Sequence, residues 1–352
     1  MNATKKAPTV VDEEKVTILC RNRSSPSFQP VTVNDKQVMD KLDFRKPLAL
    51  IVHGWNGNIS KPFMRNLTQN YILYVDSNLC LVEWSSLAAC EYSVVFEQGV
   101  KKVVNHLTRF VRFVHRNGMA YDDVTLVGHS LGAHIAGLVG KNLDGRIGAI
   151  YALDPAGVLF TFPLDVGEEK RLAPTDAQYV QAIYTSSGTL AMSVAAGQQN
   201  FWVNKDGAHP QPGCEDASTE TDEFERMYEA VGCSHRMALV YFTEALNPEV
   251  NFTMKRCYAY LMYQSGLCVL ATKDKLGIHA ERYSEAFIFL WKSIHHISFQ
   301  NLWKLLWNHY RTINEQNSNN WMTKVLFYII HSMMSYTYIP PHSCSCNMNE
   351  TQ

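Results

Sequence analysis

A serine between two glycines is the residue whose surroundings point most directly to chemistry. It lies in Gly128-His129-Ser130-Leu131-Gly132, which matches the pattern G-x-S-x-G. An apolar, β-branched run from Val124 precedes it, and a run rich in small residues follows, as a buried strand and a closely packed helix require. The glycines stand where a serine held in a tight strand-to-helix turn would crowd any side chain. We therefore predict a nucleophile at Ser130, the alternative being an ordinary serine in a β–α loop.

A serine nucleophile needs a carboxylate that orients and supports its base, and two aspartates are candidates. Asp154 ends the next apolar run, where Pro155 prevents a strand from continuing. Asp176 is the rival, and we expect it to be a surface carboxylate that caps a turn. We predict Asp154 as the acid, because the order serine, acid, histidine is that of α/β-hydrolases.

The base should be a histidine that lies beyond Asp154 in the chain. His235 is restrained by the neighbouring Cys233 and stands directly before an apolar stretch over 237–246, which we expect to be a helix. His209 lies in a loop between Ala208 and Pro210. A catalytic imidazole must be held within hydrogen-bond reach, which favours His235. We expect His129 and His134, which flank the serine, to pack and form hydrogen bonds beneath the turn.

The oxyanion of an acyl transfer also needs two N–H donors. One should come from Leu131, the residue after the nucleophile. The other should come from the turn His53-Gly54-Trp55, which follows the first firm strand, and we choose the Trp55 amide. An ordinary turn is the alternative interpretation of this segment.

The elements that would position these residues alternate between strand and helix. We expect strands at 47–52, 79–84, 124–128, 147–153 and 179–184, and helices at 63–74, 92–115 and after Ser130. This alternation predicts an α/β fold with a mostly parallel central sheet and helices on both faces. Functional groups of such sheets gather at the carboxyl ends of the strands, where the His53 turn, Ser130 and Asp154 all fall.

Composition narrows the class of protein. The 352 residues carry a net charge of −1 and 18% charged residues, without the clustered basic surface of a nucleic-acid binder. No apolar run reaches the length of a membrane span. The nine cysteines lack the spacing of a zinc site and favour a disulfide framework.

The cysteines and six N-x-S/T sequons point to the secretory route and an extracellular location. The first twenty residues nevertheless hold no apolar segment of the kind a signal peptide needs. We expect that this sequence begins after a cleavage site or is incomplete at its N-terminus. Within it we expect a loosely ordered arm over 1–30 anchored by Cys20, one hydrolase domain over 31–283, and a short helical C-terminal appendage over 284–352.

Taken together, these residues resemble the pancreatic lipase family of α/β-hydrolases, and more closely its arthropod branch that includes venom phospholipases A1. The resemblance runs from about Leu48 to Cys268. The motifs that carry it are His53-Gly54-Trp55, Gly128-His129-Ser130-Leu131-Gly132-Ala133-His134, Leu153-Asp154-Pro155-Ala156, Asp176-Ala177-Gln178-Tyr179-Val180, Gln211-Pro212-Gly213-Cys214 and Cys233-Ser234-His235. It implies that Ser130, Asp154 and His235 form the triad, and that Trp55 and Leu131 form the oxyanion hole.

The same resemblance implies three disulfides. Cys214–Cys233 would bracket a lid over 215–232, Cys257–Cys268 would follow, and Cys20–Cys90 would match the bridge of the venom enzymes. Cys80, Cys344 and Cys346 stay unassigned. The chain departs from the family pattern at Glu83-Trp84, where Asp-Trp is usual, and at Tyr184, where histidine is usual.

The function that the resemblance implies is hydrolysis of a fatty-acyl carboxylic ester by a secreted serine enzyme. Triacylglycerol lipases of the family carry a long lid and a long loop after the Tyr184 strand, whereas phospholipases A1 shorten both. Here the lid is intermediate and strongly acidic, and the stretch 186–200 is short. We expect a phospholipase A1-like enzyme that cleaves the sn-1 acyl ester, with a triacylglycerol lipase as the alternative.

A non-catalytic lipid-binding or yolk-type protein on the same fold is the second alternative. We expect the partner to be a lipid substrate at a membrane, micelle or droplet surface. The reaction needs no metal and no organic cofactor. Neither a nucleic acid nor a colipase-like partner is implied.

Overall fold

The computed structural model describes residues 15–25, 27–214, 223–250, 252–257, 262, 265, 267–268, 273–282 and 287–291. One sheet of eleven strands runs through this part of the chain, in the order β10-β9-β11-β8-β7-β6-β5-β3-β4-β1-β2. Its strands are β1 Thr17–Arg21, β2 Gln29–Pro30, β3 Leu48–Val52, β4 Asn78–Glu83, β5 Val124–His129, β6 Ala149–Leu153, β7 Tyr179–Tyr184, β8 Gln199–Val203, β9 Thr253–Arg256, β10 Lys273–Lys275 and β11 Phe287–Trp291.

The strands from β4 to β11 along the sheet are parallel, and antiparallel strands complete both edges. The helices are α1 Val38–Lys41, α2 Pro62–Tyr74, α3 Ser85–Ala88, α4 Tyr92–Val94, α5 Val100–Arg116, α6 Leu131–Lys141 and α7 Glu223–Glu244, with a π-helical turn over Val95–Gly99 between α4 and α5. The predicted α/β fold with a mostly parallel sheet is therefore confirmed.

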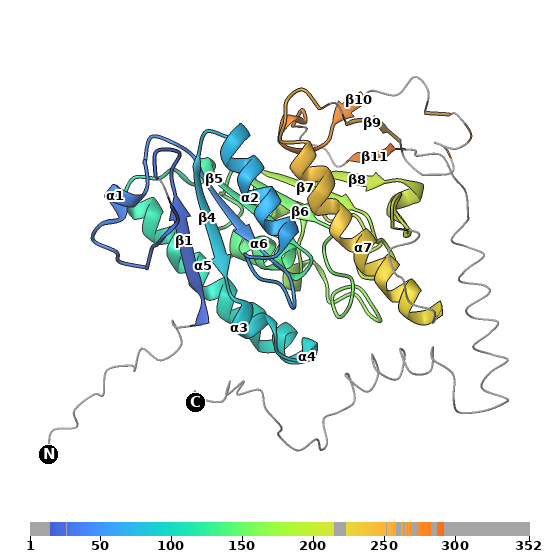
Figure 1. The fold of residues 1–352 in the computed structure, drawn as a ribbon, viewed down its shortest axis with the longest axis horizontal. Helices are drawn as coiled ribbons and strands as arrows, with labels where there is room; N and C mark the ends of the chain where they lie inside the picture. Colours follow the sequence, from blue (N-terminus) through green and yellow to red (C-terminus); the bar gives the residue numbers. More distant parts are fainter. Residues whose placement is uncertain are drawn as a thin grey trace, which may run out of the picture.

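Helices cover both faces of the sheet (Figure 1). Strand β3 shows why, since all five of its residues are buried and alternate in direction. Leu48, Leu50 and Val52 pack in the core layer shared with α5 and α6. Ala49 and Ile51 pack in the opposite layer, shared with α2 and α7. A strand buried on both sides reads as a continuous apolar run, which is how the parallel strands could be located in the sequence.

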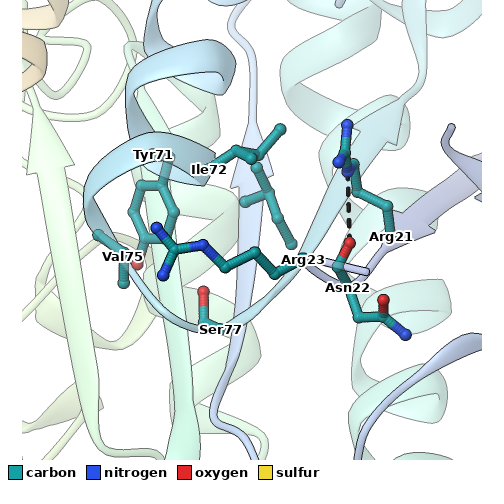
Figure 2. A pocket seen from close by; sticks show the side chains of 8 residues that line it. Arg21, Asn22, Arg23, Tyr71, Ile72, Val75 and Ser77 are labelled. Carbon is teal, nitrogen blue, oxygen red and sulfur yellow. Dashed lines mark hydrogen bonds between the residues drawn. The ribbon is translucent and has the colours of Figure 1, made fainter. Parts of the chain in front are cut away.

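The prediction of a loosely ordered arm over residues 1–30 is wrong for its second half. Residues 17–21 form β1, which pairs antiparallel with β4, and β2 extends the same edge. Figure 2 shows the turn after β1 beside the C-terminal end of α2, and Arg23 Nη2 donates a hydrogen bond to the carbonyl of Leu73 at 2.8 Å. This segment completes one edge of the domain.

The expected Cys20–Cys90 bridge is also wrong, because the structure joins Cys20 to Cys80. The two residues face each other in the β1–β4 register, with their Cα atoms 4.0 Å apart. Cysteines directly opposite on antiparallel strands are within bridging reach without movement of the backbone. Cys90 is also disulfide-bonded. The pairs Cys214–Cys233 and Cys257–Cys268 are present.

The predicted helical appendage over 284–352 is wrong at 287–291, where β11 lies parallel to β8 and antiparallel to β9. A short apolar run cannot be assigned to helix or strand by its periodicity alone. The rest of that predicted appendage, with Cys344 and Cys346, lies outside the described residues. Among the helices of the described segments, none combines the length and the apolar character needed to cross a membrane.

Candidate active site

The candidate residues gather where three adjacent parallel strands end. Strands β3, β5 and β6 are in register through Val52, Gly128 and Ala152. The residues that follow are the His53 turn, Ser130 and Asp154. The Ser130 amide donates to the Leu153 carbonyl at 3.0 Å, which ties the end of β5 to the end of β6. The sheet thus brings the three segments to one edge, as the carboxyl-end rule predicts.

Ser130 occupies a backbone conformation that side chains seldom adopt, with φ 57° and ψ −121°. The flanking glycines make this turn possible. A Cβ on Gly128 would lie 2.2 Å from the Gly132 carbonyl oxygen, and a Cβ on Gly132 would lie 2.2 Å from the carbonyl oxygen of Val52. A Cβ on Gly54 would lie 3.3 Å from Ser130 Oγ, so the hydroxyl sits directly against the His53-Gly54-Trp55 turn.

Asp154 is fully buried and hydrogen-bonded on both carboxylate oxygens. Its Oδ2 accepts from Nδ1 of His235 at 2.6 Å. Its Oδ1 accepts from the amides of Thr185 at 2.6 Å and Ser186 at 3.1 Å. A buried carboxylate is tolerated only with such partners, and these fix its plane. Asp154 is therefore positioned to hold His235 with Nδ1 protonated and Nε2 free to accept a proton.

His235 lies within α7, although the sequence placed it before a helix that starts at 237. Residues 223–232, the second part of the predicted lid, are the first turns of this helix. Residues 215–222 of the predicted lid lie outside the described part. His129 Nε2 donates to the His235 carbonyl at 3.0 Å, and the two imidazole ring centroids are 4.6 Å apart. His129 thus links the end of β5 to the helix that carries the expected base.

The two amides expected to form the oxyanion hole belong to Leu131 and Trp55. Leu131 is the first residue of α6, and the first N–H groups of a helix have no partner inside it. Within the described segments, neither the Leu131 nor the Trp55 amide donates to a protein acceptor. The Trp55 side chain is anchored separately, because its Nε1 donates to the carbonyl of Cys90 at 2.8 Å. Both amides are thus available to a ligand oxygen.

Glu83, which replaces the usual aspartate, supports the same turn from the end of β4. Its carboxylate accepts from the amides of Ile59 at 3.1 Å and Ser85 at 2.7 Å, and it lies 3.6 Å from Nε2 of His53. Burial alone would raise the pKa of Glu83, but the nearby His53 and the hydrogen bonds from Ser85 and Ile59 hold it at about 2. Glu83 therefore stays ionised and binds the amides of the segments that follow the His53 turn and β4.

The rival residues lie elsewhere. The Asp154 carboxylate binds His235, and not His209. Asp176 is buried, so the prediction of a surface carboxylate is wrong: it accepts from Lys141 Nζ at 2.6 Å. Burial raises the pKa of Asp176 to about 6, against the opposing effects of Lys141 and a backbone amide. The small residues of α6 leave room for it, since a Cβ on Gly137 would lie 2.7 Å from its Oδ2.

Sequence reasoning missed Ser186, whose hydroxyl donates to Oδ2 of Asp154 and lies 3.3 Å from Nδ1 of His235. A usable signal was present. Ser186 follows β7, the strand next to β6, and so falls on the same carboxyl edge as Asp154. Applying the carboxyl-end rule to one more strand would have included it.

His134 illustrates a buried histidine with a structural role. Its Nε2 donates to the Ala156 carbonyl at 2.8 Å, while its Nδ1 accepts from the Leu172 amide at 3.2 Å. Burial lowers the pKa of His134 to about 3, against a smaller opposing effect of the Ala156 hydrogen bond. His134 is therefore neutral and links α6 to the segment that follows Asp154.

We expect this histidine to make stability fall with acidification. The pKa is lower in the folded than in the unfolded chain, so its contribution is complete above about pH 6.5 and is lost as the pH falls towards 3. Between pH 7 and 5 the wild type should lose about 2 kcal/mol more unfolding free energy than His134→Gln, which does not titrate. Urea unfolding of both chains at the two pH values measures this difference, and parallel losses would contradict it.

Together, the fold and this corner define the chain as an α/β-hydrolase: a serine in a strained elbow and a buried aspartate–histidine pair stand at the carboxyl edge of a parallel sheet. The Lipase family model matches residues 1–288, and the chain belongs to the lipase family.

Similar proteins carry lipase names. The chain is 31% identical over 229 residues to Lipase member H of Oryctolagus cuniculus, covering 65% of this chain and 48% of that protein. It is 30% identical over 266 residues to Lipase member H of Rattus norvegicus, covering 74% and 56%. It is 28% identical over 279 residues to pancreatic lipase-related protein 2 of Cavia porcellus, covering 76% and 60%. The chain thus spans about half the length of the curated relatives it matches.

Proposed function

We propose that the protein hydrolyses fatty-acyl carboxylic esters of glycerolipids through Ser130, Asp154 and His235, and that it acts outside the cell. One observation carries the proposal: Asp154 holds Nδ1 of His235 at 2.6 Å on the sheet edge where Ser130 occupies its strained turn. The disulfides Cys20–Cys80, Cys214–Cys233 and Cys257–Cys268 support an oxidising compartment.

The reaction proceeds in two acyl-transfer steps. Ser130 Oγ attacks the ester carbonyl carbon while His235 Nε2 takes its proton, and the amides of Trp55 and Leu131 bind the oxyanion. The intermediate collapses as His235 gives the proton to the leaving alcohol oxygen, which breaks the ester C–O bond. Water then attacks the acyl-serine, again through His235, and releases the fatty acid.

Within this class we propose a phospholipase A1-like preference for the sn-1 acyl ester. The connection between β7 and β8, over 185–198, is short and is held by hydrogen bonds to the end of β7. The Tyr184 hydroxyl bridges it by donating to the carbonyl of Val194 at 3.0 Å and accepting from the amide of Ala196 at 2.9 Å. A short connection here is the feature that the resemblance assigns to phospholipases A1. The acidic composition of 215–229 disfavours an anionic lipid surface, so a zwitterionic phospholipid is the first substrate to test.

The test offers the purified protein phosphatidylcholine and triacylglycerol separately, each with a labelled sn-1 fatty acid. We expect labelled free fatty acid to appear faster from phosphatidylcholine, with the sn-2 chain retained. Release from triacylglycerol alone would identify a triacylglycerol lipase instead. No release from either lipid, combined with no adduct on Ser130 from an active-site phosphonate, would contradict hydrolysis and favour the lipid-binding alternative.

A further inference from the structure

Both oxygens of the Asp154 carboxylate are bound by a single residue that the triad does not include. The Ser186 amide donates to Oδ1 at 3.1 Å, and the Ser186 hydroxyl donates to Oδ2. Ser186 is fully buried, so water does not compete for these bonds. Two donors from one residue to the two oxygens prevent the carboxylate from rotating about its Cβ–Cγ bond.

The same hydroxyl also reaches the imidazole. Ser186 Oγ lies 3.3 Å from Nδ1 of His235, which itself lies 2.6 Å from Oδ2 of Asp154. Because the hydroxyl proton is directed to the carboxylate, an oxygen lone pair remains to face the Nδ1 proton. The three groups therefore share one buried set of hydrogen bonds, and bonds of this kind are strong where one partner is charged.

We propose that Ser186 is a positioning residue of the proposed hydrolase, which acts through Asp154 and His235 without touching substrate. Its hydroxyl fixes the plane of the carboxylate and supplies a second donor to the oxygen that binds the imidazole. A carboxylate oxygen that accepts from two donors, as Oδ2 does from Ser186 and His235, attracts the Nδ1 proton less strongly than one that accepts from His235 alone. Ser186 thus sets both the orientation of His235 and the strength with which Asp154 binds its Nδ1 proton.

The test uses the full chain with Ser186→Ala, and measures kcat/KM and the rate of Ser130 labelling by a phosphonate from pH 5 to 9. We expect kcat and the labelling rate to fall about ten- to a hundredfold with KM changed little, because a hydrogen bond to a charged group is lost. The acidic limb of both profiles should move to higher pH by about one unit. Ser186→Thr, which keeps the hydroxyl, should restore both profiles.

Ser187→Ala is the matched control, because the Ser187 hydroxyl donates to the carbonyl of Met192 at 3.3 Å and not to Asp154. This variant should label at the wild-type rate. An unchanged pH profile in Ser186→Ala would overturn the proposal. This holds if the rates stay within twofold of the wild type. It also holds if the rates fall together with the melting temperature, because the loss would then come from lower stability. The inference rests on the proposed function. If the wild type itself is not labelled on Ser130, the proposed function fails as well. If the wild type and Ser186→Ala are both labelled at the normal rate, only the role of Ser186 is removed.

Discussion

Replacing Ser130 by alanine should abolish ester hydrolysis while the chain keeps its fold. The Ser130 backbone, not its hydroxyl, makes the hydrogen bonds that join β5 to β6 and begin α6, so the substitution leaves these contacts in place. Loss of a nucleophile in a Ser-His-Asp site lowers kcat on the order of 10⁴- to 10⁶-fold. Initial rates on the preferred lipid, measured beside circular dichroism and thermal unfolding, check both halves of this expectation.

An unfolded variant would also be inactive. A melting temperature near that of the wild type therefore shows that the lost activity comes from the missing hydroxyl and not from unfolding. Ser187→Ala serves again as the control, since it removes a hydroxyl from the same sheet edge without touching Asp154 or Ser130. Turnover by Ser130→Ala within tenfold of the wild type would show that the nucleophile lies elsewhere.

The second large effect is expected at Gly132, where adding one methyl group should disrupt stability and activity together. A Cβ there would lie 2.2 Å from the Val52 carbonyl oxygen and 2.8 Å from that of His53. Both are backbone atoms, so α6 must move away from the end of β3. We expect Gly132→Ala to lower the unfolding free energy by about 3 kcal/mol. We also expect kcat to fall about a hundredfold or more, because movement of α6 would displace Leu131, whose amide we propose as an oxyanion donor, from the His53-Gly54-Trp55 turn.

Chemical unfolding and initial rates on the same preparations measure these two quantities. Gly99→Ala is the matched control, because the Cβ there meets only the Val95 side chain, at 3.3 Å. That variant should unfold near the wild-type denaturant concentration and keep its turnover. Wild-type stability and turnover in Gly132→Ala would contradict the tight contact between α6 and β3.

The local sequence located five parallel strands of the central sheet, β3 to β7, and the expected triad residues at its edge, but it missed β8, whose residues 199–203 fall in a stretch interpreted as loop-rich. Buried parallel strands read as short apolar runs, and β3, β5 and β7 were located to within a residue or two of their observed bounds. The rule that functional groups gather at carboxyl ends then brought Ser130 and Asp154 together. Glycines around the serine gave a further signal, because only a crowded turn requires them.

Features that depend on contacts between distant segments were missed. The Cys20–Cys80 bridge follows from strand register across sixty residues, which no local pattern encodes. Asp176 is buried because Gly137 and Gly140 have no side chains, which lets the Asp176 segment pack directly against α6. The small residues of α6 predict such a close contact but not which segment makes it. The apolar run at 287–291 fits a helix and a strand equally well. It forms a strand because it pairs with β8, which lies far away in the sequence.

The Cys20–Cys80 bridge has a consequence for the behaviour of the protein in concentrated solution. An exposed edge strand is a template on which a second chain can pair and aggregate. Strand β1 covers the outer edge of β4, and the bridge prevents β1 from detaching while the fold persists. Beyond it, in the part of the chain that the structure describes, stands β2, two residues long and ending in Pro30, which lacks an N–H donor. Covalent closure of this edge therefore protects the parallel sheet from edge-to-edge association between chains.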